Sequence, residues 1–211
     1  ENCLITVIGE VGDFLGYKSA RAKIDLKGNA RDKAAMGVRG GKVSIAGNVA
    51  GSVGGDTSDS YIEIGKNVGR VAKNSNNATF IIHGDINWNI EGSISKTLIR
   101  VDGSVGTSFK EERESPDICP GLTHNSIVIV GGNIYGNLGK GFQSGRIFVW
   151  GKVAGKIDTK EIEGGYIYLN SKKTSFFKRI MSGFDLKIKV QKLSEGGYLY
   201  INKEEDIKDL L

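Results

Sequence analysis

The chain has 211 residues, of which 31 are glycine and only 2 are proline, and its formal net charge is +5. Glycine is about twice as frequent as usual, yet apolar residues make up 39% of the chain, which excludes a collagen-like or disordered linker protein. Basic residues are interleaved with Asp and Glu along the whole chain, so we expect a charged surface and no nucleic-acid binding.

Ten short strands are predicted, and each carries one pair of apolar residues spaced by two. The pairs that stand four and two residues before a repeating glycine are Ile5/Val7, Ile24/Leu26, Val43/Ile45, Phe80/Ile82, Ile99/Val101, Val128/Val130 and Ile147/Val149, with Ile62/Ile64 after a slip of one residue and Ile167/Leu169 and Leu199/Ile201 continuing the series. The glycines are Gly9, Gly28, Gly47, Gly65, Gly84, Gly103, Gly132 and Gly151. Their spacing is close to 19 residues, apart from one interval of 29. Alternation predicts one buried and one wet face for each strand.

A strand that recurs every 19 residues cannot bury its apolar face alone, but stacked coils can do so. The intervals are too short for crossover helices, and regular hairpin turns are missing. The glycine-rich run "GNVAGSVGG" (47–55) therefore belongs to the repeat and not to a phosphate-binding loop. We predict an all-β chain: a single-stranded, right-handed parallel β-helix of nine or ten coils over residues 1–170, with glycines at corners that require a positive φ or a close backbone approach.

Two segments depart from the repeat. The stretch 110–124 holds both prolines and Cys119, and it is predicted to bulge from the coil either as a solvated excursion or as a docking loop. Residues 171–211 are predicted to form an α/β cap over the end of the β-helix. The cap would contain a helix over 174–184, a strand in "DLKIKV" and a short helix after Asn202.

The run "GEVGDFLG" (Gly9, Gly12, Gly16), with the strand runs "GGKVSIAGN", "SGRIFVWGK" and "GGYIYLN", resembles the GXGXG β-helix family over residues 3–170. Members of this family include the C-terminal domain of the glutamate synthase large subunit and the C subunit of formylmethanofuran dehydrogenase. The resemblance implies a non-catalytic scaffold that works inside, or descends from, an oxidoreductase complex.

Residues for catalysis are sparse. His83 is predicted to be an outward corner histidine, and His124 lies in the insertion without a predictable partner. Ser52 and Ser104 do not lie in the G-x-S-x-G nucleophile elbow that a serine hydrolase requires. Asp25 and Glu63 fall on the solvent-facing side of strands that lie two coils apart. A solvent-exposed position is the ordinary explanation for carboxylates of this kind.

The residue types also predict no metal and no cofactor. Cys3 and Cys119 are too few for a metal framework, an iron–sulfur cluster or a disulfide scaffold. No apolar run reaches membrane-spanning length and no signal peptide is visible, so we expect no membrane association and a cytoplasmic location.

The outward strand positions change character along the chain, from Thr6, Asp25, Ser44 and Glu63 to apolar and aromatic residues. Stacked coils would join these later residues into one strip, which predicts a protein interface or a surface for self-association. The candidate interface residues are Ile129, Phe148, Trp150, Tyr166, Tyr168, Tyr198 and Tyr200. We expect the C-terminal segment to cover part of the strip and a second chain to cover the rest. The leading hypothesis is a scaffold subunit, and the alternative is a stand-alone enzyme acting on a carbohydrate or an ester.

Overall fold

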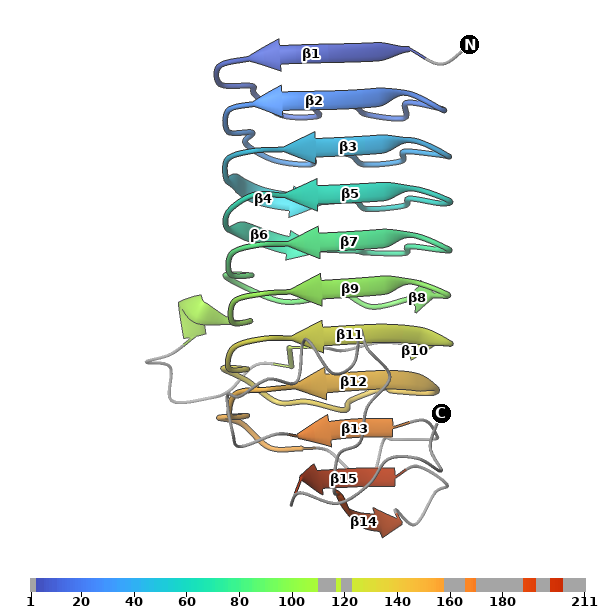
Figure 1. Cartoon of the computed structure of the whole chain (residues 1–211), viewed down its shortest axis with the longest axis vertical. Helices are drawn as coiled ribbons and strands as arrows, with labels where there is room; N and C mark the ends of the chain where they lie inside the picture. The colour runs from blue at the N-terminus through green and yellow to red at the C-terminus, as the bar shows by residue number, and fades with distance from the viewer. Residues whose placement is uncertain are drawn as a thin grey trace.

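The structure, a computed structural model, describes residues 3–109, 117–118, 123–157, 166–169, 188–192 and 198–202. The chain winds into a right-handed parallel β-solenoid of about eight turns with a repeat of about 19 residues (Figure 1). The predicted fold class is therefore confirmed, with about eight turns where nine or ten coils were predicted. The predicted helices over 174–184 and after Asn202 lie outside the described residues, and the boundary at residue 170 stays a prediction.

One face of the solenoid is a sheet of eleven strands. Ten of these strands run in parallel in the order β1 (Leu4–Ile8), β2 (Lys23–Lys27), β3 (Lys42–Ile45), β5 (Tyr61–Ile64), β7 (Thr79–Ile82), β9 (Leu98–Val101), β11 (Ser126–Val130), β12 (Gly145–Val149), β13 (Tyr166–Leu169) and β15 (Tyr198–Asn202). β14 (Ile188–Lys192) is the last strand in the sheet order, and it pairs antiparallel with β15. The strand predicted in "DLKIKV" thus exists, but it does not continue the coil.

The ten predicted apolar pairs lie in register along this sheet. Val43 and Ile45 are at most 1% exposed, as are their neighbours Ile62 and Ile64. Burying an aliphatic side chain of this size contributes roughly 1.5–3 kcal/mol, so the stacked pairs are the main source of stability. An apolar pair becomes fully buried only where a neighbouring coil stacks on each side of it.

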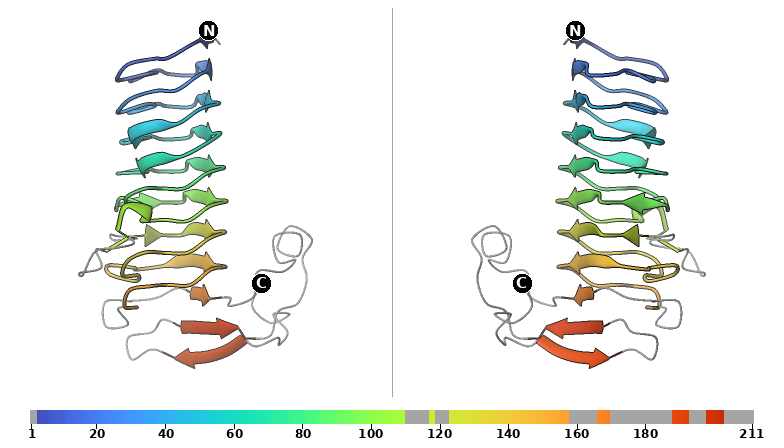
Figure 2. Two further views of the ribbon diagram at one scale, coloured as in Figure 1. Left: turned by 90° about the vertical axis from the view of Figure 1, so that its left-hand side faces the viewer. Right: turned by 90° about the vertical axis from the view of Figure 1, so that its right-hand side faces the viewer.

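Two further two-stranded sheets lie on the parts of the coil away from the main sheet (Figure 2). β4 (Val49–Val53) pairs in parallel with β6 (Val68–Val71), and β8 (Ile94–Ser95) pairs with β10 (Thr123–His124). A 3₁₀ turn, η1, covers Thr107–Phe109. β4 lies inside the "GNVAGSVGG" run, so this stretch contains a strand of the second face as well as corner glycines.

A ladder of polar side chains explains the repeating glycines. Asn29 Oδ1 accepts a hydrogen bond from the N–H of Asn48 at 2.7 Å, and Asn48 Oδ1 accepts one from the N–H of Asn67 at 3.1 Å. The same bond recurs in later coils, where the acceptors are Asn67, Asp85, Ser104 and Asn133. A Cβ on Gly47 would collide with Asn29 Oδ1, and one on Gly103 would collide with Asp85 Oδ1. Close approach thus excludes a side chain at these corners, whereas among the eight repeating glycines, all of them described, Gly9 alone has a positive φ, of 108°.

The insertion returns to the coil before its predicted end at residue 124. Asp117 forms a parallel bridge with Asn137, and Ile118 is fully buried in the core. His124 is the second residue of β10. The extra residues of the long interval therefore lie between η1 and Asp117, and residues 110–116 and 119–122 are outside the described part of the chain.

Candidate functional site

A charged cluster crosses four coils on the outer face of the main sheet. His83, which directly follows β7, has its Nδ1 2.9 Å from Asp102 Oδ2 and its Nε2 3.2 Å from Glu63 Oε1. Lys42 Nζ extends the cluster by donating to Glu63 at 3.4 Å. Arg100 Nε closes the other end by donating to Asp102 at 2.8 Å. The coil stacking brings these side chains together, because adjacent coils each supply one or two of them.

The two carboxylates fix the charge of the histidine. The hydrogen bond to Glu63, followed by the one to Asp102, raises the pKa of His83 above its ordinary value despite partial desolvation. In return, the hydrogen bond to His83 lowers the pKa of Glu63, with Lys42 adding to the effect. The charges of the cluster therefore alternate in sign from coil to coil, and the ion pairs between them connect neighbouring coils.

This arrangement is suited to structure and poorly suited to catalysis. Both ring nitrogens of His83 face a carboxylate, so neither is available to take a proton from a substrate. The prediction of an outward histidine is correct, since His83 is exposed, but its two partners were missed. The available signal was the spacing: Asp102 follows His83 by 19 residues and occupies the same coil position. Asp25 is half-buried on the outer face, as predicted, and pairs with Lys27 at 2.9 Å.

The other candidate catalytic residues are not brought together. Ser104 Oγ accepts the N–H of Asn133 at 3.0 Å and so belongs to the corner ladder. Ser52 lies in β4, where its N–H donates to Asp32 Oδ1 at 2.7 Å. His124 is exposed, with its Nδ1 3.5 Å from Ser144 Oγ. In the part of the chain that the structure describes, Ser52 and Ser104 form no hydrogen bond with either histidine.

A groove of about 590 Å³ crosses the face that carries β4 and β6. The small residues Ala50, Gly51 and Ser52 of β4 line it, and a Cβ on Gly51 would collide with the Asp32 carboxylate. The Arg70 guanidinium lies 4.8 Å from the centre of the Trp88 ring, which is a cation–π contact. Sequence reasoning missed this groove, because its residues come from five different coils.

The carboxylate of Asp32 in this groove stays ionised. Burial raises the pKa of Asp32, but the N–H groups of Ser52 and Lys33 outweigh it, so the pKa is below its usual value. An acid that gives up its proton this readily is a poor general acid near neutral pH. Asp32 is thus suited to accept hydrogen bonds from a ligand and poorly suited to donate a proton.

The predicted aromatic strip is partly covered within the chain itself. The register places Ile129, Phe148 and Tyr168 side by side on successive strands. The rings of Phe148 and Tyr168 stack with centres 4.4 Å apart, and the Phe148 and Trp150 rings lie 6.0 Å apart. Trp150 and Tyr168 are 5% and 7% exposed, whereas Ile129 and Phe148 are half-buried.

The rest of the strip is described only through its backbone. Tyr166, Tyr198 and Tyr200 lie on paired strands, β13 and β15. Burial of two members inside the chain narrows the surface available to a partner. The assignment of the strip to an interface stays a prediction.

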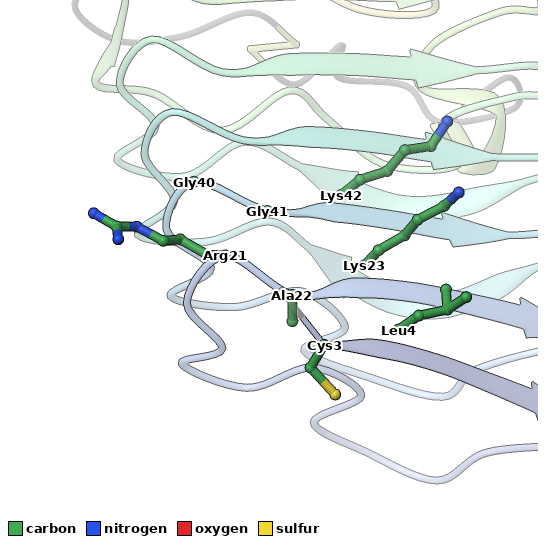
Figure 3. Close-up of a pocket in the computed structure, with 8 residues that line it drawn as sticks. All are labelled: Cys3, Leu4, Arg21, Ala22, Lys23, Gly40, Gly41 and Lys42. Carbon is green, nitrogen blue, oxygen red and sulfur yellow. The ribbon is translucent and has the colours of Figure 1, made fainter. Parts of the chain in front are cut away.

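Among the described residues, β2 is the only strand that pairs with β1. β1 is the edge strand of the main sheet, and three of its residues are exposed apolar side chains: Leu4 (64%), Ile5 (43%) and Ile8 (85%). An open hollow of about 400 Å³ lies beside this edge (Figure 3). Leu4, Lys23 and Lys42 occupy equivalent positions on its three strands, and the thiol of Cys3 is free and exposed.

Among the described residues, no group of three or more His, Cys, Asp or Glu side chains is arranged to hold a metal ion. No helix in the described ranges is long and apolar enough to cross a membrane.

Comparisons with family models, with curated proteins and with solved structures found no match to this chain. The fold and the candidate sites together define a parallel β-solenoid with a charged cluster on the main sheet, a groove on the face of β4 and β6, and exposed apolar residues on β1.

Proposed function

We propose that this chain is a non-catalytic scaffold that works in a protein assembly. The observation that carries the proposal is the open end at β1, where an unpaired strand edge coincides with exposed Leu4, Ile5 and Ile8. Such an edge is a template for pairing with another chain and is seldom left bare. His83 is held between the carboxylates of Glu63 and Asp102, which supports a structural role for this histidine.

The proposed assembly is an oxidoreductase complex of the glutamate synthase or formylmethanofuran dehydrogenase type, and the proposed location is the cytoplasm. Support comes from the resemblance of "GEVGDFLG" and the glycine-led strand runs to GXGXG β-helices. In this proposal the chain orients its partner subunits and supplies no catalytic group, cofactor or metal ligand.

The test is a fourfold replacement: His83→Gln, His124→Gln, Ser52→Ala and Ser104→Ala. The tagged chain is purified from its native cells, and the oxidoreductase activity of the complex that accompanies it is measured with a redox dye. We expect turnover per complex to stay within about twofold of wild type. A tenfold fall in turnover with unchanged assembly contradicts a scaffold, and a purified chain without any oxidoreductase partner contradicts the proposed complex.

A carbohydrate-binding or carbohydrate-cleaving protein is the second candidate, and the groove beside Trp88 favours it. An indole half-buried next to ionised Asp32 and to Asp13 offers a flat apolar face and hydrogen-bond acceptors. Binding of soluble oligosaccharides that quenches tryptophan fluorescence in wild type but not in Trp88→Ala would favour this candidate.

A further inference from the structure

The free edge of β1 presents a defined set of backbone groups. The C=O of Cys3 accepts a hydrogen bond from Lys23 N–H at 2.8 Å, and the N–H of Gly9 donates to Lys27 C=O at 3.2 Å. Because hydrogen-bonding direction alternates along a strand, the odd-numbered residues of β1 face β2. The N–H and C=O groups of Leu4, Thr6 and Ile8 therefore point toward the unpaired edge.

The sequence of β1, "LITVI", is self-complementary about its centre. In an antiparallel pair of two such strands centred on Thr6, each Thr6 faces the Thr6 of the other copy and each Leu4 faces an Ile8. All three residues with free backbone groups then form hydrogen-bonded pairs at once. Registers shifted by two residues leave part of these groups unpaired.

The same register matches the side chains on both faces. On the inner face, Ile5 of each copy would lie opposite Val7 of the other and extend the core over the exposed end. On the outer face, Leu4 would lie opposite Ile8. The equivalent residues on β2 are Lys23 and Lys27, so among the first two strands the outward positions flanking the centre are apolar only on β1.

Charges on the first turn are also complementary under this two-fold relation. Glu10 stands four residues after Thr6, and Arg21 stands four residues before Asp25, the residue that pairs with Thr6. Asp13 and Lys18 stand seven residues away in the same two directions. All four side chains are exposed. The two-fold operation therefore brings Glu10 of one copy to about two strand spacings, or ~10 Å, from Arg21 of the other, so that charges of opposite sign approach across the seam.

We infer that a second copy of this chain docks on the β1 edge, with the two β1 strands antiparallel and centred on Thr6. The result is a two-fold symmetric dimer in which the main sheet runs continuously from one solenoid into the other. The inference rests on the proposed scaffold function and names the occupant of its open end. An isologous contact of this kind closes on itself and leaves no β1 edge exposed.

The register is tested by thiol crosslinking of the full chain in a Cys3→Ser, Cys119→Ser background. With a short bifunctional thiol reagent, Thr6→Cys should crosslink to itself, and a mixture of Leu4→Cys and Ile8→Cys proteins should crosslink efficiently. Leu4→Cys alone should crosslink at least tenfold less. The matched control is a mixture of Lys23→Cys and Lys27→Cys, whose positions lie about three strand spacings, or ~14 Å, apart in the dimer.

The stoichiometry is tested by light scattering. Thr6→Lys places two like charges opposite each other on the two-fold axis and should raise the dimer Kd at least tenfold. The control is Ser44→Lys, which sits in the same outward column two coils away and should leave the dimer intact. Both variants should keep the circular dichroism of the wild type, because both positions face outward.

A wild-type chain that is monomeric at all concentrations overturns the inference, as does efficient self-crosslinking of Leu4→Cys, which requires another register. Coverage of β1 by another segment or a different protein would produce the monomeric result. If Thr6→Lys is monomeric but still joins the native complex at full activity, the dimer stands and so does the scaffold. If the fourfold replacement of histidines and serines abolishes turnover while crosslinking is unchanged, the scaffold function fails and the dimer remains.

Discussion

Asn29 Oδ1 accepts a hydrogen bond from the N–H of Asn48, 2.7 Å away and one coil further along the chain. The amide of Asn29 occupies the space that a side chain on Gly47 would need. One residue thus requires the other: the polar ladder exists because the repeating positions beside it are glycine. This relation sets the first two predictions.

Gly47→Ala should lower the free energy of unfolding by about 1–3 kcal/mol, because the new methyl group collides with the Asn29 amide and with the backbone of Gly28. Urea unfolding followed by circular dichroism measures the change. Gly12→Ala is the matched control, since a Cβ on Gly12 meets nothing within 4 Å, and it should be nearly neutral. Equal effects of the two substitutions would contradict a steric origin of the repeat.

Asn67→Ala should cost about 1 kcal/mol, because it removes the acceptor of the Asp85 N–H, a bond of 2.9 Å. Asn67→Asp keeps an acceptor at this position, as Asp85 itself does one coil later, and should recover most of the loss. Thermal unfolding measures the stability of the two variants relative to the wild type. An Asn67→Asp protein as unstable as Asn67→Ala would show that the ladder bond is not the cause.

Much of the fold could be predicted from the sequence because two periods act together. A period of two sets which side chains face inward, and a period of 19 sets which residues of successive coils are neighbours. Val43 and Ile62, for example, are in register as expected. Most of what was missed depends on side-chain direction: the bonds of Asn29 to Asn48 and of His83 to Asp102 need particular rotamers as well as adjacent coils.

The coverage of surfaces was harder still to predict. Tyr168 faces outward by alternation yet is buried, so its position in the strand alone did not determine its exposure. β14 likewise alternates like the coil strands but runs antiparallel to β15, since direction is set by the connecting segment and not by the strand pattern.

The charged cluster predicts a pH dependence of stability. The pKa of His83 is raised by folding. Its contribution to the free energy of unfolding is therefore complete below the ordinary imidazole pKa of about 6.5, and it is lost as pH rises through the higher folded pKa. Glu63, whose pKa is lowered, contributes above the ordinary carboxyl range and loses that contribution as pH falls through its folded pKa. The cluster should therefore stabilise most between about pH 5 and 6.

Comparing wild type with His83→Gln between pH 5 and 9 tests this dependence. Because these side chains are partly exposed, we expect a difference of at most about 1 kcal/mol that shrinks in high salt. A difference in stability that grows with rising pH would contradict the assignment of a protonated histidine.

The aromatic strip predicts unequal roles for its members. Tyr168→Ser should destabilise the chain by about 3–5 kcal/mol, because it deletes a buried ring stacked on Phe148. Ile129→Ser, at a half-buried position, should cost about 1 kcal/mol and, if the strip binds protein, should weaken partner capture. Thermal unfolding and light scattering separate the two effects, and an unchanged melting temperature for Tyr168→Ser would contradict its burial.

Hydrogen–deuterium exchange at β1 tests the central claim, that the open end of the solenoid is an assembly surface, most directly. The amides of Leu4, Thr6 and Ile8 point away from β2, so no strand among the described residues pairs with them in an isolated solenoid. We predict that at high protein concentration they exchange at least tenfold more slowly than in the Thr6→Lys variant, and that dilution removes the difference. Rapid exchange of these three amides at every concentration, with the amides of β2 protected throughout, would contradict the account.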